Sequence, residues 1–484
     1  MKSHTLTSRA EAFDRRQFIA LGTAIAALGM NGCQPGKEPA ASSKPEKGTA
    51  KAASLRLLVL DDDALRDAIA SLWKAQLESD AQFVNLTRKE LLEAKRVSAD
   101  VLVFPLELMG TLIENGLLDP LQTSALEDDA LNFRDFWQST RMQVCRFGGN
   151  TYAIPLSSPA LYLVYRQDVF KELGIAVPTT WEEVTAATKQ LAAWCEKEPG
   201  RTAIALPLAN GQRSRTLLTI AAAQLADNEQ VSPLFDPNTM DSLVHLPPMV
   251  KGLETLVGLA AGTADRLSAR EAWLRVAQGK CAMALAEVPF GALPEGTTEQ
   301  LENLAYAAVP GSRERYDFSK GEFVPLAEGE SPSTPLVGAE AWGVAISSSA
   351  GQLRLAERFL SWISSEENLT ALGSQSQHVG PVRTTMKGSL KKWLPSGSSA
   401  EAIAKVAALQ GDAATAQTNL VALRVAAADE YLAILDAAVE AALTGKAVQE
   451  SLQQAKLSCD EVTKRLGQER QLRSLKRSYG QQLH

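Results

Sequence analysis

Residues 151–184 constrain the fold more than any other stretch of this chain. They read as an apolar strand, a short helix that Gly174 closes, an extended step at a proline and then a new helix. Thr179 or Thr180 can cap that second helix, which places Glu183 in its first turn, where a carboxylate favours the helix dipole. A strand followed closely by capped helices predicts an α/β protein.

The alternation of strands and helices extends along the chain. We expect apolar strands at 55–60 and 98–105, each followed by a helix, and the second of these helices ends at Asn115-Gly116. Further strands are expected at 202–206, 281–285, 305–309 and 342–346. Because nearly continuous apolar strands are typical of sheets buried on both faces, the pattern predicts parallel-dominated sheets flanked by helices. A helical C-terminal region follows, with helices at 401–409, 416–443 and 448–466.

Several motifs in a fixed order resemble one known family. Residues 151–184 carry a small-residue–Pro strand, then Tyr-x-x-Asp-x-Phe, Leu-Gly and Pro-x-Thr-Trp-Glu-Glu, an order similar to the family 1 extracellular solute-binding proteins of ABC importers, which include maltose-binding proteins. The other matching segments are 100–118, 273–283, 309–311, 338–346, 356–363 and 445–452. The resemblance implies a two-lobed periplasmic-binding-protein fold (type II-like) that closes on a ligand, with 151–165 crossing between the lobes.

The resemblance also implies how the chain is divided. We expect residues 54–158 and 309–384 to form lobe 1, and residues 159–308 and 385–466 to form lobe 2. The remaining residues, 467–484, are locally basic and read as a solvated tail.

The first 53 residues read as an export signal and a tether. Arg15-Arg16 resembles a twin-arginine signal, and the apolar run 18–30 is too short to span a bilayer. The run ends in a sequence that resembles a lipobox, so we expect a signal peptide at 1–33 and a lipid on Cys33. Residues 34–53 are rich in Pro, Ser, Ala, Lys and Glu, which predicts a flexible tether. The protein would then be exported and lipid-anchored at the periplasmic face of a membrane; an ordinary secretory signal with an incidental cysteine is the alternative.

Charge and cysteine usage narrow the possible functions. The net charge is −7 with both signs mixed, and no Lys/Arg cluster is interleaved with aromatic residues, which argues against a nucleic-acid partner. No cysteine lies in a C-x-x-C pair, so neither a zinc site nor a thioredoxin-like motif is indicated. The sequence predicts no metal and no cofactor, and it leaves open whether disulfides form among Cys145, Cys195, Cys281 and Cys459.

Candidate ligand residues follow the strand ends, where open α/β sheets bind their ligands. In the resemblance, Asp63 takes the place of a sugar-binding carboxylate, although an aspartate there can equally cap a helix. Phe104 and Glu107 take an aromatic stacking position and a carboxylate position, a pair suited to the C–H face and the hydroxyls of a sugar. Leu108 replaces a charged residue of the maltose-binding branch, which speaks against maltose itself.

Three further residues complete the predicted site. Glu287 follows a strand where the family often has an aromatic residue nearby. Trp342 enters its strand between Gly338 and Gly343, which permit close backbone approach; core packing is the alternative for this ring. Arg383 lies in a segment that resembles the family's hinge region, and it can donate either to a ligand or to a surface acid.

The expected function is capture of a small solute, most simply a sugar or oligosaccharide, and its delivery to ABC permease subunits by a monomeric binding protein. The four histidines are scattered, and no metalloprotease, nucleophile-elbow or P-loop motif is present, so we expect no enzymatic activity. A binding protein that reports its ligand to a membrane sensor, and an exported carbohydrate-active hydrolase, are the alternatives.

Overall fold

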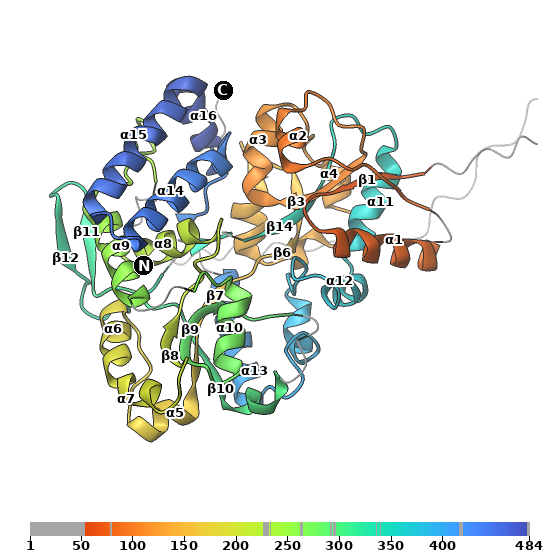
Figure 1. Cartoon of the computed structure of the whole chain (residues 1–484). Coiled ribbons are helices and arrows are strands. Elements are labelled where there is room, and N and C mark those ends of the chain that lie inside the picture. The colour runs from red at the N-terminus through yellow and green to blue at the C-terminus, as the bar shows by residue number, and fades with distance from the viewer. Residues whose placement is uncertain are drawn as a thin grey trace, which may run out of the picture. The chain divides into compact units, whose positions relative to one another are not determined.

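Two β-sheets organise the folded part of the chain, and helices cover both faces of each (Figure 1). We refer to each sheet with its helices as lobe 1 or lobe 2, in the order in which the chain enters them. The structure, a computed structural model, describes residues 54–77, 80–225, 232, 234–261, 265–290, 293, 297–334, 336–338, 340–415 and 420–481.

The sheet of lobe 1 has five strands in the order β2-β1-β3-β14-β6. Their bounds are β1 (Arg56–Val59), β2 (Gln82–Phe83), β3 (Val101–Pro105), β6 (Ala153–Ser157) and β14 (Trp342–Ile346). The helices around this sheet are α1 (Asp63–Leu77), α2 (Arg88–Glu93), α3 (Met109–Glu114), α4 (Thr123–Leu126), α11 (Leu353–Ile363) and α12 (Glu366–Gly373). Strand β3 is buried throughout because alternate residues enter two different cores: Val101 and Val103 pack with α1 and α11, and Leu102 and Phe104 pack with α2 and α3.

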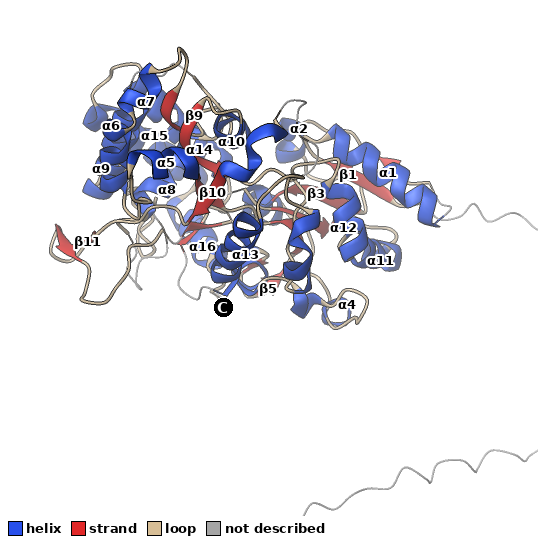
Figure 2. Cartoon of the chain, turned by 90° about the horizontal axis from the view of Figure 1, so that it is seen from below, coloured by secondary structure: helices blue, strands red, loops and turns tan. Residues whose placement is uncertain are grey.

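The sheet of lobe 2 has four strands in the order β10-β7-β9-β8. Their bounds are β7 (Leu161–Arg166), β8 (Thr202–Ala205), β9 (Cys281–Glu287) and β10 (Leu304–Ala307). The helices of this lobe are α5 (Gln167–Leu173), α6 (Trp181–Gln190), α7 (Ala192–Glu196), α8 (Arg213–Ala222), α9 (Pro247–Ala260), α10 (Ala269–Ala277), α13 (Ala400–Thr415), α14 (Ala428–Leu443) and α15 (Val448–Leu466). Figure 2 shows these helices and strands from a second direction.

Both sheets are mixed, which corrects the prediction that parallel pairs dominate. In lobe 1, β1 pairs parallel with β2 and β3, whereas β14 pairs antiparallel with β3 and β6. In lobe 2, β8 and β9 are parallel, but β7 is antiparallel to β9 and to β10. The reason is the crossovers: Trp342, the first residue of β14, is opposite Pro105, the last residue of β3. Strand β3 ends at the edge of lobe 1 that faces lobe 2, and β14 starts at that same edge because the chain returns there from lobe 2. The two strands therefore run in opposite directions.

The crossover between the lobes is short. Strand β6 ends at Ser157 in the first sheet and β7 begins at Leu161 in the second, so only residues 158–160 separate them. Gly343 of β14 packs so closely against Leu106 and the backbone of β6 that an added Cβ would lie 2.6 Å from a methyl carbon of Leu106 and 3.0 Å from the Ile154 carbonyl oxygen. The prediction of close backbone approach at Gly343 is therefore confirmed.

Local signals in the sequence set several helix ends as predicted. The Thr180 hydroxyl accepts a hydrogen bond from the Glu183 backbone N–H at 3.3 Å and caps α6. Gly174 ends α5 with a φ of 64°, a left-handed conformation that glycine adopts without steric cost. Gly445 separates α14 from α15 with a φ of 103°.

Three segments differ from the prediction. The helix expected over 416–443 begins only at Ala428, since β15 (Leu420–Val421) pairs with β13 (Leu336–Val337). The segment around the hairpin of β11 (Glu314–Asp317) and β12 (Glu322–Pro325), assigned to lobe 1 by resemblance, contacts lobe 2, where the Tyr316 N–H donates to the Gln224 carbonyl at 2.9 Å.

The third difference concerns the basic C-terminal segment, which is a packed helix rather than a solvated tail. Helix α16 (Gln468–Ser478) buries Leu475 and packs against α15, α3 and β4 (Arg146–Phe147). Its Arg477 carbonyl accepts from the Gly148 N–H at 2.7 Å, and the Arg477 guanidinium pairs with Glu114 at 2.8 Å. The helix therefore joins the end of lobe 2 to lobe 1.

The remaining short elements connect these parts. They are β5 (Asn150–Thr151), the 3₁₀ turns η1 (Leu106–Leu108), η2 (Phe133–Asp135), η4 (Thr298–Asn303) and η5 (Thr385–Lys392), and the π-helical turn η3 (Thr140–Val144).

Among the described residues, no helix has both the length and the hydropathy needed to cross a membrane. Cys145, Cys195, Cys281 and Cys459 are all free thiols.

Candidate functional site

Two cavities lie where the strand ends of the lobes face each other. Cavity A has a volume of about 410 Å³ and is bounded by the crossover, α8, α13 and the segment before β14. Cavity B has a volume of about 710 Å³ and is bounded by η1, α8, α14 and the start of β14. Gln212, Arg215 and Glu340 line both, so these three side chains form a shared wall.

Arg215 is the centre of that wall. This α8 residue pairs with Glu340 at 2.6 Å and with Glu107, and Glu107 also accepts from the Arg88 guanidinium at 3.0 Å. Arg88 in turn pairs with Asp61 at 2.8 Å. Because α8 belongs to lobe 2 and both glutamates belong to lobe 1, the ion pairs of Arg215 join the two lobes.

Burial and charge shift the pKa values of this group. Burial favours the neutral guanidinium of Arg215, but the nearby Glu340 and Glu107 outweigh it and raise the Arg215 pKa. Burial raises the pKa of the Glu340 carboxyl to about 8 despite the opposing effect of Arg215. Because burial disfavours the ionised carboxylate of Glu340, a second positive charge beside it would stabilise that ionised form.

Glu287 lines cavity A at the last residue of β9, opposite Leu161 of β7. Burial raises the pKa of its carboxyl to about 7, although the charge of Arg215 acts in the opposite direction. Among the described residues, Glu287 forms no ion pair and no hydrogen bond through its side chain. The predicted ligand residue Glu287 is thus at a cavity, with a carboxylate that is not committed to a structural partner.

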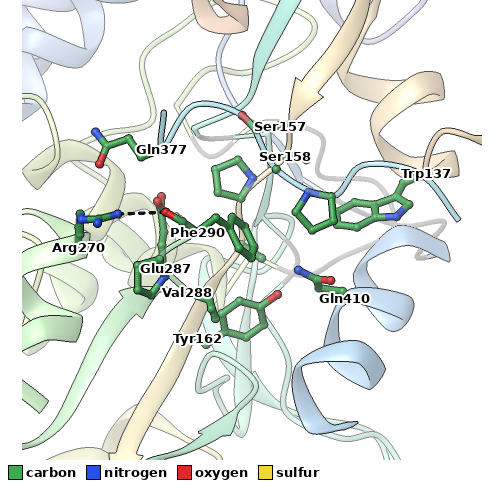
Figure 3. A pocket seen from close by; sticks show the side chains of 15 residues that line it. Trp137, Ser157, Ser158, Tyr162, Arg270, Glu287, Val288, Phe290, Gln377 and Gln410 are labelled. Carbon is green, nitrogen blue, oxygen red and sulfur yellow. Dashed lines mark hydrogen bonds between the residues drawn. The ribbon is translucent and has the colours of Figure 1, made fainter. Parts of the chain in front are cut away.

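Next to Glu287, cavity A offers aromatic surface and neutral polar groups. A smaller pocket of about 30 Å³, drawn in Figure 3, shares Trp137, Tyr162, Glu287 and Gln410 with cavity A and extends to Phe290. In it, Tyr162 of β7 and Gln410 of α13 direct their polar ends toward each other. Rings beside hydroxyl, amide and carboxylate groups suit a small ligand that carries both hydroxyls and apolar faces.

Trp342 lines cavity B, where its ring stacks on that of His378. The ring centroids are 4.0 Å apart and the planes differ by 12°. Nδ1 of His378 lies 2.7 Å from a carboxylate oxygen of Asp62, which also accepts from the Ser376 hydroxyl at 2.6 Å. Since Trp342 is only 5% exposed and packs in the lobe 1 core, it presents little of its ring to the cavity.

Asp63 lies outside both cavities, on the exposed surface at the start of α1. Its side chain is 87% exposed and pairs with Arg66 at 2.6 Å, one turn along the same helix. Its neighbour Asp62 performs the capping role, because its carboxylate accepts from the Leu65 backbone N–H at 2.8 Å. Both line a more open pocket of about 430 Å³ at the edge of lobe 1.

Phe104 is not brought to either cavity. Its side chain is fully buried in the core beneath α2 and α3, because it alternates with Val103 across a strand whose two faces are both covered. Glu107 lines cavity B, since the η1 turn after Pro105 redirects the chain. The ring and the carboxylate that the resemblance predicts side by side therefore lie in different environments.

Arg383 is a structural residue of lobe 1 in this arrangement. Its guanidinium donates to the Ser364 carbonyl at 2.7 Å and to the Leu131 carbonyl at 2.9 Å, lies 4.0 Å from the ring centre of Phe136, and pairs with Asp135 at 3.5 Å. Burial lowers the Arg383 pKa from its ordinary value. It lines neither cavity, and its donors are used within the lobe.

Several cavity residues lie at positions that no sequence motif marks. Tyr162 was at least within the segment predicted to cross between the lobes. Arg215 lies on a helix that is buried along most of its length, and Trp137 and Gln410 come from segments with no motif, so only the folded arrangement identifies them. Cys33, the predicted lipid attachment site, lies outside the described residues. Among the residues that the structure describes, no group of three or more His, Cys, Asp or Glu side chains could hold a metal ion.

Solved structures share this architecture. An ABC-transporter solute-binding protein from Agrobacterium radiobacter K84, in complex with ribitol, has a TM-score of 0.64 and 19% sequence identity, covering 85% of this chain and 99% of that one. A solute-binding protein from Agrobacterium vitis S4 with bound D-mannitol has a TM-score of 0.61 and 15% identity, covering 86% and 99%. The GacH receptor of Streptomyces glaucescens GLA.O, solved unliganded and with acarbose and an acarbose homologue, has a TM-score of 0.59 and 16% identity, covering 85% and 98%.

These likenesses confirm the two-lobed α/β fold. At the level of sequence, the family described as bacterial extracellular solute-binding protein matches residues 87–420, which is more than half of the chain and includes strands of both sheets. This chain therefore belongs to the family of bacterial extracellular solute-binding proteins.

Proposed function

We propose that this protein binds a sugar or polyol in cavity A and delivers it to the permease of an ABC importer. The observation that carries the proposal is the composition of the cavity wall, in which Trp137 and Tyr162 lie with Gln410 and Glu287 around a volume of about 410 Å³. This volume lies within the usual range for small-molecule sites. The three structural neighbours, whose bound compounds are ribitol, D-mannitol and acarbose, support the same class of solute.

A binding experiment tests the solute class. Ribitol, D-mannitol and maltotriose are titrated calorimetrically into the full chain, after a thermal-shift screen in which a bound ligand raises the unfolding temperature. We expect at least one of them to bind, and Gln410→Ala to weaken binding about tenfold through loss of one hydrogen bond to the ligand. If sugars and polyols as a class fail to bind, while an amino acid or peptide does, the proposal is wrong.

Of the residues named from sequence, we retain Glu287 as a ligand-binding residue, and Glu107 and Trp342 as residues of the adjoining cavity B. Solute capture is proposed to occur by closure of the two lobes about the crossover at residues 158–160. Binding should then reduce the radius of gyration measured by solution scattering. An unchanged radius with a saturating ligand would contradict closure.

We propose that binding involves no chemical conversion of the solute. The family and the structural neighbours are binding proteins, which supports this view. Incubating the protein with its ligand and analysing the solution by chromatography should return the ligand unaltered. Turnover that a single carboxylate change abolishes would favour a hydrolase.

We further propose that the mature protein is a monomer attached to the periplasmic face of a membrane by a lipid on Cys33. The Arg15-Arg16 pair, the short apolar run and the position of Cys33 support export and lipidation. Cys33→Ser should move the protein from the membrane fraction to the soluble fraction. Membrane association that persists in Cys33→Ser, with no lipid on the native protein, would refute the anchor.

A further inference from the structure

Within the described residues, the Glu287 carboxylate in cavity A has no ion-pair or hydrogen-bond partner, and its surroundings already hold a surplus of carboxylates. Arg88 and Arg215 together pair with Asp61, Glu107 and Glu340, so these two cations are outnumbered before Glu287 is considered. Nearby, Arg270 of α10 lines the smaller pocket with Glu287, but its Nη1 donates to the Phe290 carbonyl at 3.3 Å (Figure 3). The remaining charged group on the cavity wall is Asp412 of α13, another carboxylate.

A second observation independent of charge points to a ligand at the same place. Tyr162 and Gln410 are 4% and 6% exposed, and neither the Tyr162 hydroxyl oxygen nor Gln410 Oε1 has a hydrogen-bond partner among the described residues. Burial raises the pKa of Tyr162 and the side chain of Gln410 lowers it, so the two polar groups lie close to each other. Buried polar atoms are seldom left without partners, and a ligand beside Glu287 would supply them.

Resting on the proposed function, we propose that the solute is a sugar or polyol that carries a protonated amine, and that Glu287 pairs with this amine in cavity A. The hydroxyls of the solute would use Tyr162 and Gln410, and Trp137 would cover an apolar face. An ammonium group compensates the surplus of carboxylates, which a neutral solute leaves unchanged. It also places a cation in a partly desolvated site, where a charge-assisted hydrogen bond is stronger than one between neutral groups.

Matched ligand pairs test this proposal. D-sorbitol is compared with 1-amino-1-deoxy-D-sorbitol, and D-glucose with D-glucosamine, by calorimetric titration of the full chain at pH 7.5. We expect at least one amine to bind about tenfold to a hundredfold more tightly than its neutral counterpart. Glu287→Gln should remove that preference, whereas Glu328→Gln, an equal charge change at an exposed residue that lines none of these cavities, should keep it.

The pH dependence of ligand affinity distinguishes an amine that pairs with ionised Glu287 from a neutral polyol that accepts a hydrogen bond from protonated Glu287. An alkyl amine such as that of 1-amino-1-deoxy-D-sorbitol stays protonated well above neutral pH, so its affinity should rise between pH 6 and pH 8 as Glu287 loses its proton. A neutral polyol that accepts a hydrogen bond from protonated Glu287 would instead bind more weakly as the pH rises.

Failure of the amine proposal and failure of the proposed solute class give different results. Equal binding of both members of every pair, or a preference that survives Glu287→Gln, would overturn the amine while leaving the sugar or polyol site intact. Failure of all four compounds, together with failure of the neutral compounds used to test the solute class, would overturn both the amine and the solute class.

Discussion

Arg215 of α8 and Glu340 before β14 form an ion pair of 2.6 Å that joins lobe 2 to lobe 1 across the wall shared by the two cavities. The guanidinium is 17% exposed and the carboxylate 24%, so both groups are largely removed from water. The pair therefore links the relative position of the lobes to the charge of the binding site.

Arg215→Met should destabilise the protein because it leaves Glu340 and Glu107 without their shared cation. Breaking a fully buried pair costs about 3–5 kcal/mol, and because this pair is partly exposed and Arg88 remains beside Glu107, we expect about 1–3 kcal/mol. Urea unfolding measures the loss. The double variant Arg215→Met/Glu340→Gln should recover part of it, since the uncompensated carboxylate is also removed; strictly additive losses would show that the two residues are not coupled.

Glu287 and Glu340 should make stability fall as the pH rises through the neutral range. Their pKa values are raised by burial to about 7 and about 8, above the ordinary glutamate value, so the folded state holds protons that the unfolded state releases. Their contribution is complete below about pH 4.5 and is lost as the pH passes through 7 and 8.

Urea unfolding of the parent and of Glu287→Gln/Glu340→Gln at pH 5 and pH 8.5 tests this sign. The double variant should be favoured over the parent more at pH 8.5 than at pH 5, with a difference on the order of 1–3 kcal/mol. A difference between parent and variant that does not change with pH would refute the raised pKa values.

Arg383→Met should damage folding and not ligand affinity. The substitution leaves the carbonyls of Leu131 and Ser364 without the guanidinium donor and removes the cation that pairs with Asp135, which costs about 3–5 kcal/mol. Arg358→Met, on the exposed side of α11, is the matched control and should leave the unfolding free energy nearly unchanged. A large loss of affinity in Arg383→Met without loss of stability would restore the ligand-binding role predicted from the sequence.

Glu107→Gln should lower the unfolding temperature of the unliganded protein. A surface or purely ligand-facing carboxylate would leave it unchanged, but this one accepts from Arg88 and pairs with Arg215. Loss of these charge-assisted bonds should cost about 1–3 kcal/mol. Asp63→Asn removes the same charge at an exposed site and should have almost no effect on thermal unfolding, so equal unfolding temperatures for the two variants would contradict the structural role of Glu107.

The sequence alone determined the class of fold and much of its local structure. Helix ends at Gly174, Thr180 and Gly445 could be predicted from the sequence. Backbone conformation and helix capping depend on residues within one or two helical turns, and these neighbours are known from the sequence. The order of motifs also identified the family, and the segment 151–165 that it predicted to cross between the lobes contains residues 158–160, which separate β6 from β7. These features depend on local chemistry or on the order of segments, both of which are present in a linear sequence.

Only the tertiary structure decided which side chains face the cavities. Phe104 and Glu107 are three residues apart, yet one is fully in the core and the other lines cavity B, and a strand covered on both faces gives no pattern that separates them. Arg215 meets Glu107 and Glu340 only after both lobes have folded, because it comes from a different lobe. The direction of β14 is likewise set by the edge at which the chain re-enters lobe 1, and that edge is a property of the packed lobes rather than of any local segment.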